Sequence, residues 1–330
     1  MRAGAGYASV RAPRAADPTR LQDLSGATMG TSWSLRFDNP AMLPLDGVRA
    51  AVEAAFARVI SQMSTWEPQA DICRFNSAAA RTTHVLAPEF LQVMDCALKW
   101  AQASDGAIDP TVGKLVGLWG FGAQAQPPGH SQAMAIEAAR QSVGWRRLQF
   151  DREAATIHQP GDLVLDLSGI AKGFAVDLAC AALEDLGLNN FLMEVGGELR
   201  ASGTRPGGQP WRIQVQAADG VSIPLALSDV SVATSGDRWH RHAFDGRDWS
   251  HTIDPRSGRP ADSNLAAVSV LHPLCMDADA LATLLTVMGP VDGMAFARQH
   301  EVAALFVTRE RNGSFTHVAS PHWPGGRAAA

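Results

Sequence analysis

A carboxylate and a hydroxyl one helical turn apart form the first candidate for chemistry in this sequence. Asp279 and Thr283 lie in the segment M-D-A-D-A-L-A-T, which begins at Met276 and is predicted to be helical. Residues four apart share one face of a helix. Their oxygens suit a hard cation such as Mg²⁺, with carbonyls, phosphates or waters completing the octahedron. The alternative is structural: the acid interacts with the helix dipole, and the threonine bonds back to a carbonyl.

A second candidate is the stretch L-V-L-D-L-S-G-I-A-K-G-F-A-V-D, residues 163–177. The apolar run Leu163–Leu165 predicts a buried strand, and the small residues from about Ile170 predict a helix packed closely on it. Gly169 allows a ligand to approach the backbone. Lys172 adds a positive charge in the first helical turn, where unpaired N–H groups already favour an anion such as phosphate. An ordinary strand–helix joint with a surface lysine is the alternative.

Histidine supplies a third candidate. His251, in S-H-T-I-D-P-R-S-G-R-P beside Asp254, could serve as a general base because its pKa lies near working pH. A purely structural histidine is the alternative. A rival interpretation takes His240, His242 and His251 as zinc ligands. No second carboxylate or cysteine nearby completes that set, so the pattern indicates it only weakly.

Two common phosphate-binding signatures are absent from the sequence. The run Gly169–Gly173 lacks the spacing and the following Ser or Thr of a P-loop, and the pair Gly196-Gly197 is no G-x-G-x-x-G. A nucleotide would have to be held in another way.

Composition narrows the function classes. The 330 residues are 46% hydrophobic and 18% charged, with a net charge of −5 and no basic run, which argues against nucleic acid as a partner. The cysteines form no C-x-x-C pair and indicate buried or free thiols rather than a zinc site or disulfides. They are Cys73, Cys96, Cys180 and Cys275.

Helices and antiparallel strands mix without βα alternation, so the expected class is α+β, with mixed, largely antiparallel sheets and packed helices. A glycine-rich segment, 105–122, is expected to be an irregular loop that forms a binding wall. No repeat or linker divides the chain. The predicted helices are 45–63, 88–104, 131–143, 170–186, 276–288 and 291–300, and the predicted strands are 32–37, 148–151, 156–158, 191–195, 198–202, 211–217, 222–226, 231–234, 266–271, 302–307 and 315–318.

The N-terminal segment has arginines but neither an apolar core nor a lipobox-like cysteine, so no signal peptide is expected in Met1–Asp23. No apolar run is expected to be long enough to span a bilayer. The compartment is left open, because a misplaced start site could hide an export signal.

As a set, these residues resemble the ApbE family of FAD:protein FMN transferases. The similarity covers about Met29 to Gly289 in family order. The matching segments are M-G-T-S-W at Met29, M-S-T-W-E-P at Met63, D-I-C-R-F-N at Asp71, the run D-G-A-I-D-P-T-V-G-K-L-V-G-L-W-G-F-G at Asp105, L-D-L-S-G-I-A-K-G-F-A-V-D at Leu165, E-V-G-G-E-L-R-A-S-G at Glu194, A-T-S-G-D at Ala233, S-H-T-I-D-P-R-S-G-R-P at Ser250 and M-D-A-D-A-L-A-T at Met276.

The resemblance implies a T-fold-like architecture in one domain, residues 26–320, between a flexible segment 1–25 and a loose tail 321–330. It implies Mg²⁺-dependent transfer of the FMN half of FAD to a threonine of a target protein, with release of AMP. The metal ligands would be Asp279, Thr283 and the carbonyl of Gly169; the catalytic residues would be His251 and Lys172. FAD contacts would come from Met29, Trp66, Ala107, Ile108, Asp109, Asp166, Lys172, Glu194, Gly196, Gly197, the turn of Thr234, Ser235 and Gly236, and Ile253.

The sequence departs from the family pattern at a few positions. Trp66 and Phe174 stand where tyrosine is common, and Cys73 stands where serine is common. Trp66 can still stack on a flavin or adenine ring. Two other functions stay open at this point: a protein that binds FAD without transferring it, and a Mg²⁺-dependent pyrophosphatase that splits FAD into FMN and AMP.

Overall fold

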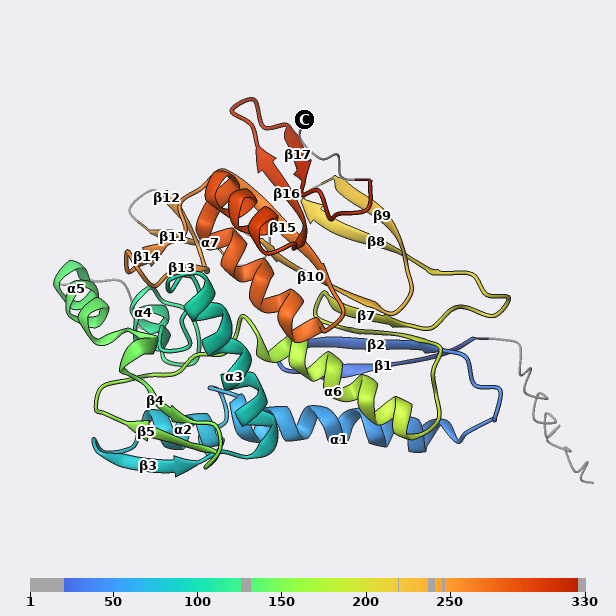
Figure 1. The fold of residues 1–330 in the computed structure, drawn as a ribbon, viewed down its shortest axis with the longest axis horizontal. Coiled ribbons are helices and arrows are strands. Elements are labelled where there is room, and N and C mark those ends of the chain that lie inside the picture. The colour runs from blue at the N-terminus through green and yellow to red at the C-terminus, as the bar shows by residue number, and fades with distance from the viewer. Residues whose placement is uncertain (1–20, 126–131, 219, 237–240, 245–246, 326–330) are drawn as a thin grey trace, which may run out of the picture.

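An eight-stranded sheet runs through the centre of the protein (Figure 1). The computed structural model describes residues 21–125, 132–218, 220–236, 241–244 and 247–325. Neighbouring strands of the sheet are antiparallel throughout, and their spatial order follows the order of the chain. The strands are β1 (Gln22–Thr28), β2 (Thr31–Phe37), β6 (Phe191–Val195), β7 (Glu198–Ser202), β10 (Val230–Gly236), β15 (Leu265–His272), β16 (Ala303–Arg309) and β17 (Phe315–Ala319).

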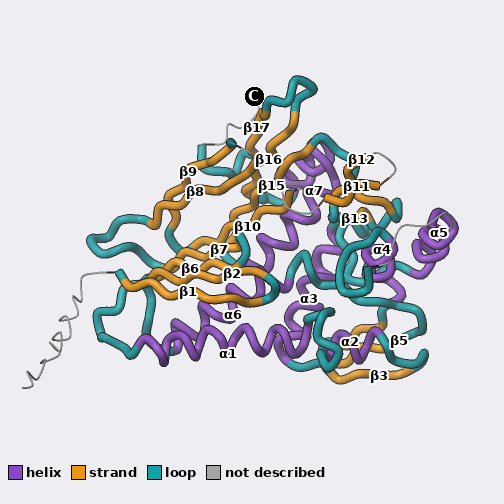
Figure 2. Tube along the Cα trace, turned by 180° about the vertical axis from the view of Figure 1, so that it is seen from behind, coloured by secondary structure: helices purple, strands orange, loops and turns teal. Residues whose placement is uncertain are grey.

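Three long helices cover one face of this sheet: α1 (Leu45–Met63), α6 (Ala171–Asp185) and α7 (Cys275–Gln299). The strands meet them with alternate residues, as a half-covered sheet requires. In β6, Phe191, Met193 and Val195 are fully buried against the helices. Figure 2 shows the helices gathered behind the strands. Burial of this shared apolar face is the main force that fixes the helices on the sheet.

A β-hairpin covers part of the other face. It consists of β8 (Trp211–Ala218) and β9 (Val221–Leu227), which pair only with each other among the described strands. Its core residue is Trp211, which is 1% exposed and donates its indole N–H to the Ser202 carbonyl at 3.0 Å. The hairpin therefore anchors on the end of β7 and leaves the rest of β8 beside the central strands.

A smaller layer lies at one end of α1, below the long helices in Figure 1. The loops between its helices border the cavity of the candidate active site. The elements are α2 (Asp71–Asn76), α3 (Pro88–Ala103), α4 (Gly113–Leu118), α5 (Gln132–Ser142), a short 3₁₀ turn at Trp145–Arg147, and the sheet β3 (Thr82–Val85), β5 (Thr156–Gln159) and β4 (Gln149–Asp151). Two further pairs are β11 (Arg241–Phe244) with β12 (Arg247–Ser250) and β13 (Ile253–Asp254) with β14 (Arg259–Pro260).

The α+β class with largely antiparallel sheets is confirmed, and most predicted elements lie within a few residues of their expected bounds. The predicted strand Leu163–Leu165 is wrong. Only Val164 makes an isolated bridge there, to Val112. Leu165 instead pairs its backbone with the Asn76 amide, whose Oδ1 accepts at 2.7 Å and whose Nδ2 donates at 2.9 Å. A side chain therefore takes the place of a neighbouring strand.

Segment 105–122, expected to be irregular throughout, contains helix α4. Gly113, the first residue of α4, allows the helix to pack closely on Val164. A Cβ on Gly113 would lie 2.7 Å from the Val164 side chain and 2.8 Å from the Val164 carbonyl. The flexible-segment prediction for 1–25 is also wrong from Gln22 onward, because β1 begins there and pairs with β2. Residues 1–20 lie outside the described part of the chain.

The prediction of a loose tail over 321–330 is wrong at Trp323, which is 5% exposed and packs in the core around the β8–β9 hairpin. Residues 326–330 lie outside the described part.

The expectation that no apolar run is long enough to span a bilayer is wrong for helix α7. Among the described residues it is the one helix long and apolar enough, by length and composition, to cross a membrane. Most of that apolar segment is buried inside the protein, 61% of it, which is typical of a core helix. The two predicted helices 276–288 and 291–300 meet here at a kink, where Gly289 has φ 77° and Pro290 follows. Proline in a helix interior removes a hydrogen bond and bends the axis.

Candidate active site

A cavity of about 1280 Å³ opens between the central sheet, the N-terminal parts of α6 and α7, and the loops of the smaller layer. Every site residue assigned by the family resemblance borders this cavity, although their segments span most of the chain. These residues are Met29, Trp66, Ala107, Ile108, Asp109, Asp166, Gly169, Lys172, Glu194, Gly196, Gly197, Thr234, Ser235, Gly236, His251, Ile253, Asp279 and Thr283.

The predicted magnesium ligands lie where α6 and α7 meet. Gly169 lies two residues before the start of α6 and packs on Thr283, because a Cβ at Gly169 would lie 2.9 Å from Thr283 Oγ1. Asp279 is 5% exposed and accepts a 3.0 Å hydrogen bond from the Gly173 N–H. A carboxylate, a hydroxyl and a backbone carbonyl are hard oxygen donors, so the donor set fits Mg²⁺. The described residues hold no cluster of three or more His, Cys, Asp or Glu side chains suited to a metal.

A glycine allows the two helices to approach closely beside these ligands. A Cβ at Gly173 would lie 2.4 Å from the Cys275 carbonyl and 2.8 Å from Asp279 Cβ. Asp177, one turn further along α6, accepts bonds from the backbone N–H groups of Cys275 (2.9 Å) and Met276 (2.8 Å), which cap the start of α7. Helix α6 therefore fixes both the position and the orientation of the Asp279 segment.

Lys172 and two carboxylates, Glu198 and Asp279, form a charged cluster on the cavity wall. Lys172 Nζ lies 2.5 Å from Glu198 Oε1. Burial would lower the pKa of the Lys172 ammonium, but the charges of Glu198 and Asp279 outweigh it and raise that pKa above its usual value. Burial raises the pKa of Glu198 to about 7, with Lys172 opposing the rise and Asp279 adding to it. Burial also raises the pKa of Asp279, against Lys172 and the Gly173 N–H.

The wall that carries Asp109 and Asp166 is held by local hydrogen bonds. Asp109 Oδ1 accepts from the N–H (2.8 Å) and hydroxyl (2.7 Å) of Thr111, and Oδ2 accepts from the Trp145 N–H at 2.8 Å. Burial raises the pKa of Asp109 despite these bonds. Asp166 Oδ1 accepts from the Ser168 N–H at 2.8 Å, just before Gly169. Both of Asp109's oxygens are therefore used in shaping the wall, which favours a binding role over proton transfer.

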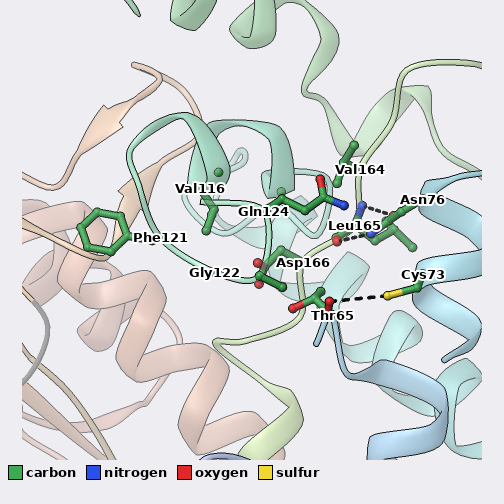
Figure 3. Close-up of a pocket in the computed structure, with 13 residues that line it drawn as sticks. Thr65, Cys73, Asn76, Val116, Phe121, Gly122, Gln124, Val164, Leu165 and Asp166 are labelled. Atoms are coloured by element: carbon green, nitrogen blue, oxygen red, sulfur yellow. Dashed lines mark hydrogen bonds between the residues drawn. The ribbon is translucent and has the colours of Figure 1, made fainter. Parts of the chain in front are cut away.

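Trp66 stands at the mouth of the cavity, 71% exposed, on the loop after α1. The Cys73 thiol lies under this loop and contacts the carbonyls of Ser64 (3.5 Å) and Thr65 (3.6 Å). Figure 3 shows the bond to Thr65, with Asp166 beside it and the Asn76–Leu165 pair above it in the view. A thiol in the place of the family's serine therefore still supports the loop, and the indole face is left for a planar ring.

The sheet supplies the opposite wall. Thr234–Gly236, expected to form a turn, are instead the last residues of strand β10, and Thr234 Oγ1 shares a 2.8 Å hydrogen bond with Ser269 Oγ of β15. Glu194 Oε1 accepts from the Gly197 N–H at 2.8 Å and so fixes the β6–β7 turn at the cavity edge. Gly196 has φ 58°, a conformation that favours glycine there.

His251 borders the cavity and packs edge-on against Phe121, with 6.4 Å between the ring centroids. Asp254, its predicted neighbour, has both oxygens bonded by Arg256: Nε at 2.9 Å to Oδ1 and Nη2 at 3.2 Å to Oδ2. His240 and the side chain of His242, the other two residues of the zinc interpretation, lie outside the described residues.

Sequence reasoning missed two contributors to the cavity. One is Glu198, whose position as a charged residue inside the buried strand β7 was a usable signal. The other is the run Ile213–Gln216 of β8, where four consecutive residues border the cavity. Successive side chains of a strand point to opposite faces, so this pattern places the edge of β8 on the cavity. Nothing in the local sequence marks that edge.

The comparisons define the class of protein that this fold and cavity belong to. The profile of the ApbE family matches residues 29–306, and the chain belongs to this family. It is accordingly an enzyme of the transferase class. A relative from Vibrio cholerae named FAD:protein FMN transferase is 33% identical over 312 residues, covering 93% of each chain. One from Haemophilus influenzae with the same name is 32% identical, covering 92% of this chain and 90% of its own.

Solved structures agree with this assignment. The apo flavinyl transferase ApbE of Pseudomonas stutzeri superimposes with a TM-score of 0.83 at 34% identity, covering 92% of this chain and 95% of that one. The flavin transferase ApbE of Vibrio cholerae gives 0.83 at 34% identity, covering 93% and 99%.

Proposed function

We propose that this protein transfers the FMN moiety of FAD to a threonine hydroxyl of a target protein and releases AMP, with Mg²⁺ bound in the cavity. The observation that supports this most directly is the single cavity bordered by all the residues that the family resemblance assigns to FAD, metal and catalysis. Membership of the ApbE family and the names of the relatives support the flavin donor and the protein acceptor. We also propose that the expected domain 26–320 acts as one unit and extends to Gln22 and Trp323, since one sheet includes both β1 and β17 and Trp323 packs in the core.

In this proposal the cation is held by Asp279, Thr283 and the Gly169 carbonyl. A bound Mg²⁺ would neutralise charge on the diphosphate and stabilise the departing phosphate of AMP. Trp66 would stack on a ring of FAD, and the wall of Asp109 and Asp166 would shape the nucleotide's path. Lys172, at the start of α6, would share the diphosphate charge with the positive end of the helix dipole.

The transfer itself is a displacement at the phosphorus that carries riboflavin. The threonine oxygen forms a bond to this phosphorus while the bond to the bridging oxygen breaks, and the bridging oxygen leaves with AMP. His251 would accept the threonine proton, which makes a covalent protein intermediate unnecessary. Asp109 and Asp254, the other candidates for the base, have both oxygens engaged by neighbouring groups. His251 therefore remains our proposed base.

The test is direct. The purified protein is mixed with FAD, Mg²⁺ and an acceptor domain from a protein known to carry FMN on threonine. We expect a fluorescent acceptor band on a denaturing gel, a mass gain of FMN less one water, and AMP in equal amount. FMN and AMP with an unlabelled acceptor would mean that water is the acceptor and would contradict the transferase proposal. Bound but intact FAD would reduce the protein to an FAD carrier.

The role of the histidine has its own test. We expect His251→Ala to keep FAD binding, measured by titration, and to lose roughly a hundredfold or more in transfer rate, as loss of a general base typically does. A variant that labels the acceptor at the wild-type rate would place the base elsewhere.

A further inference from the structure

Glu198 is a buried carboxylate that the proposed reaction does not yet use. Its side chain is 3% exposed at the start of β7, on the cavity wall. Oε1 contacts Lys172 Nζ at 2.5 Å, whereas the buried Oε2 has no hydrogen-bond partner among the described residues. A half-paired carboxylate is costly inside a protein. Fold stability alone therefore gives no reason for an acid here.

Lys172 is the group through which Glu198 can act. Its side chain is about a third exposed, at 34%, so the ammonium reaches from the protein interior to the cavity. The next residue, Gly173, donates its N–H to Asp279, which ties the backbone beside Lys172 to the predicted metal ligand. Strand β7 therefore holds the head group of Lys172, and α7 holds its backbone. The described residues show no other ion pair for this lysine.

We propose that Glu198 is a positioning residue, which holds the Lys172 ammonium at the cavity wall in the place where the diphosphate of FAD binds. This inference rests on the proposed function. A lysine has a flexible four-carbon stem and a compact charge, so without an anchor its ammonium samples many positions. A charge that is already in place stabilises developing negative charge without rearranging during the reaction. Glu198 would act through Lys172 and need not touch the substrate.

The first test uses the free protein and does not depend on activity. Limited acylation with acetic anhydride, followed by peptide mass mapping, gives the reaction rate of each lysine. We expect Lys172 to react about tenfold faster in Glu198→Gln. Without the neighbouring carboxylate the pKa of Lys172 falls, and a fall of about one unit raises the fraction of free amine about tenfold. Asp162→Asn is the matched control: it removes the partner of Lys114 (2.9 Å) and should leave the Lys172 rate unchanged. Equal Lys172 rates in wild type and Glu198→Gln would overturn the proposal.

The second test separates positioning from a purely structural role. Transfer rates at saturating FAD are measured for wild type, Glu198→Gln, Lys172→Ala and the double variant. We expect Glu198→Gln to lower kcat roughly ten- to a hundredfold when Lys172 is present, the scale of a misplaced catalytic group. In the Lys172→Ala background the same change should alter kcat less than twofold. Equal losses in both backgrounds would overturn the proposal.

These outcomes separate the inference from the proposed function. If wild type transfers no FMN, the proposed function fails, and the acylation result still decides whether Glu198 holds Lys172. If wild type is active and the losses of kcat in the two single variants simply add in the double variant, the positioning role alone fails. If Glu198→Gln does not fold, Glu198→Asp replaces it in the kinetic test. It keeps the charge but shortens the reach, so it should lower kcat only when Lys172 is present, and equal losses in both backgrounds would overturn the proposal.

Discussion

The close approach of α6 and α7 makes Gly173→Ala the most informative substitution. A methyl group at this position would lie 2.4 Å from the Cys275 carbonyl and 2.8 Å from Asp279 Cβ. The Cys275 backbone and the buried Asp279 side chain have no room to move aside, so α6 and α7 must separate to admit the methyl group. Alanine improves helix propensity by about 1 kcal/mol over glycine, whereas overpacking costs about 1–3 kcal/mol and occasionally more. Because both contacts are shorter than 3.0 Å, the cost belongs in the upper part of that range, about 2–3 kcal/mol, and we expect a net loss of about 1–2 kcal/mol in the free energy of unfolding.

The effect on activity should be larger than the effect on stability. Moving α6 away from α7 lengthens the 3.0 Å bond from Gly173 N–H to Asp279 and shifts Gly169 relative to Thr283. Displacing a catalytic constellation by an ångström can cost about a hundredfold in rate. We therefore expect transfer to fall roughly ten- to a hundredfold while the variant remains folded.

Urea unfolding and the acceptor-labelling assay measure both quantities. Gly47→Ala is the matched control, because Gly47 lies in α1 and a Cβ there would have no neighbour within 4 Å. This control should gain up to about 1 kcal/mol and keep the wild-type rate. If Gly173→Ala is as stable and as active as wild type, the two helices are not held at the distance described, and our account of the metal ligands fails with it.

Three further predictions concern the cavity. Asp279→Ala should abolish magnesium-dependent turnover, measured as labelling rate against Mg²⁺ concentration; an unchanged metal dependence would contradict the ligand assignment. Trp66→Ala should weaken FAD binding by about 1 kcal/mol, near fivefold in Kd, the scale of an aromatic stacking contact; Trp66→Tyr should restore most of it, and equal affinities for wild type and the alanine variant would exclude stacking. The third concerns pH. The Glu198 pKa is raised from 4.5 to about 7, so its stabilising contribution is complete below about pH 4.5 and is lost as pH rises through about 7. Relative to Glu198→Gln, the free energy of unfolding of wild type should fall by up to roughly 3 kcal/mol between these pH limits, measured by urea unfolding. A difference in unfolding free energy between the two proteins that stays constant from pH 5 to pH 8 would refute this.

The residues of the site were predictable because their chemistry is local. Asp279 and Thr283 share a helix face by spacing alone, and Gly169 and Lys172 lie together at one helix start. That the distant segments meet in one cavity came from the family resemblance, not from periodicity. The roles of these residues remain predictions.

What the sequence could not supply depends on contacts between distant segments. Leu163–Leu165 has a strand's composition, but the amide of Asn76, far away in the chain, provides its partner. Strand β1 lies at the sheet edge with alternate residues exposed, so its apolar signal is weak. Glu198 is marked only by being acidic inside a buried strand, and its link to Lys172 requires the sheet to lie against α6.

The order of the sheet has a consequence for how the enzyme is made. Each strand lies beside the one added before it in the chain, so the sheet can grow from β1 during synthesis and no strand has to enter between two that are already paired. Domains synthesised from the N-terminus can begin to fold before the chain is complete. Helix α7, which carries Asp279 and Thr283, emerges late. A nascent chain can therefore assemble most of the cavity wall early, yet complete the proposed cation site only near the end of translation.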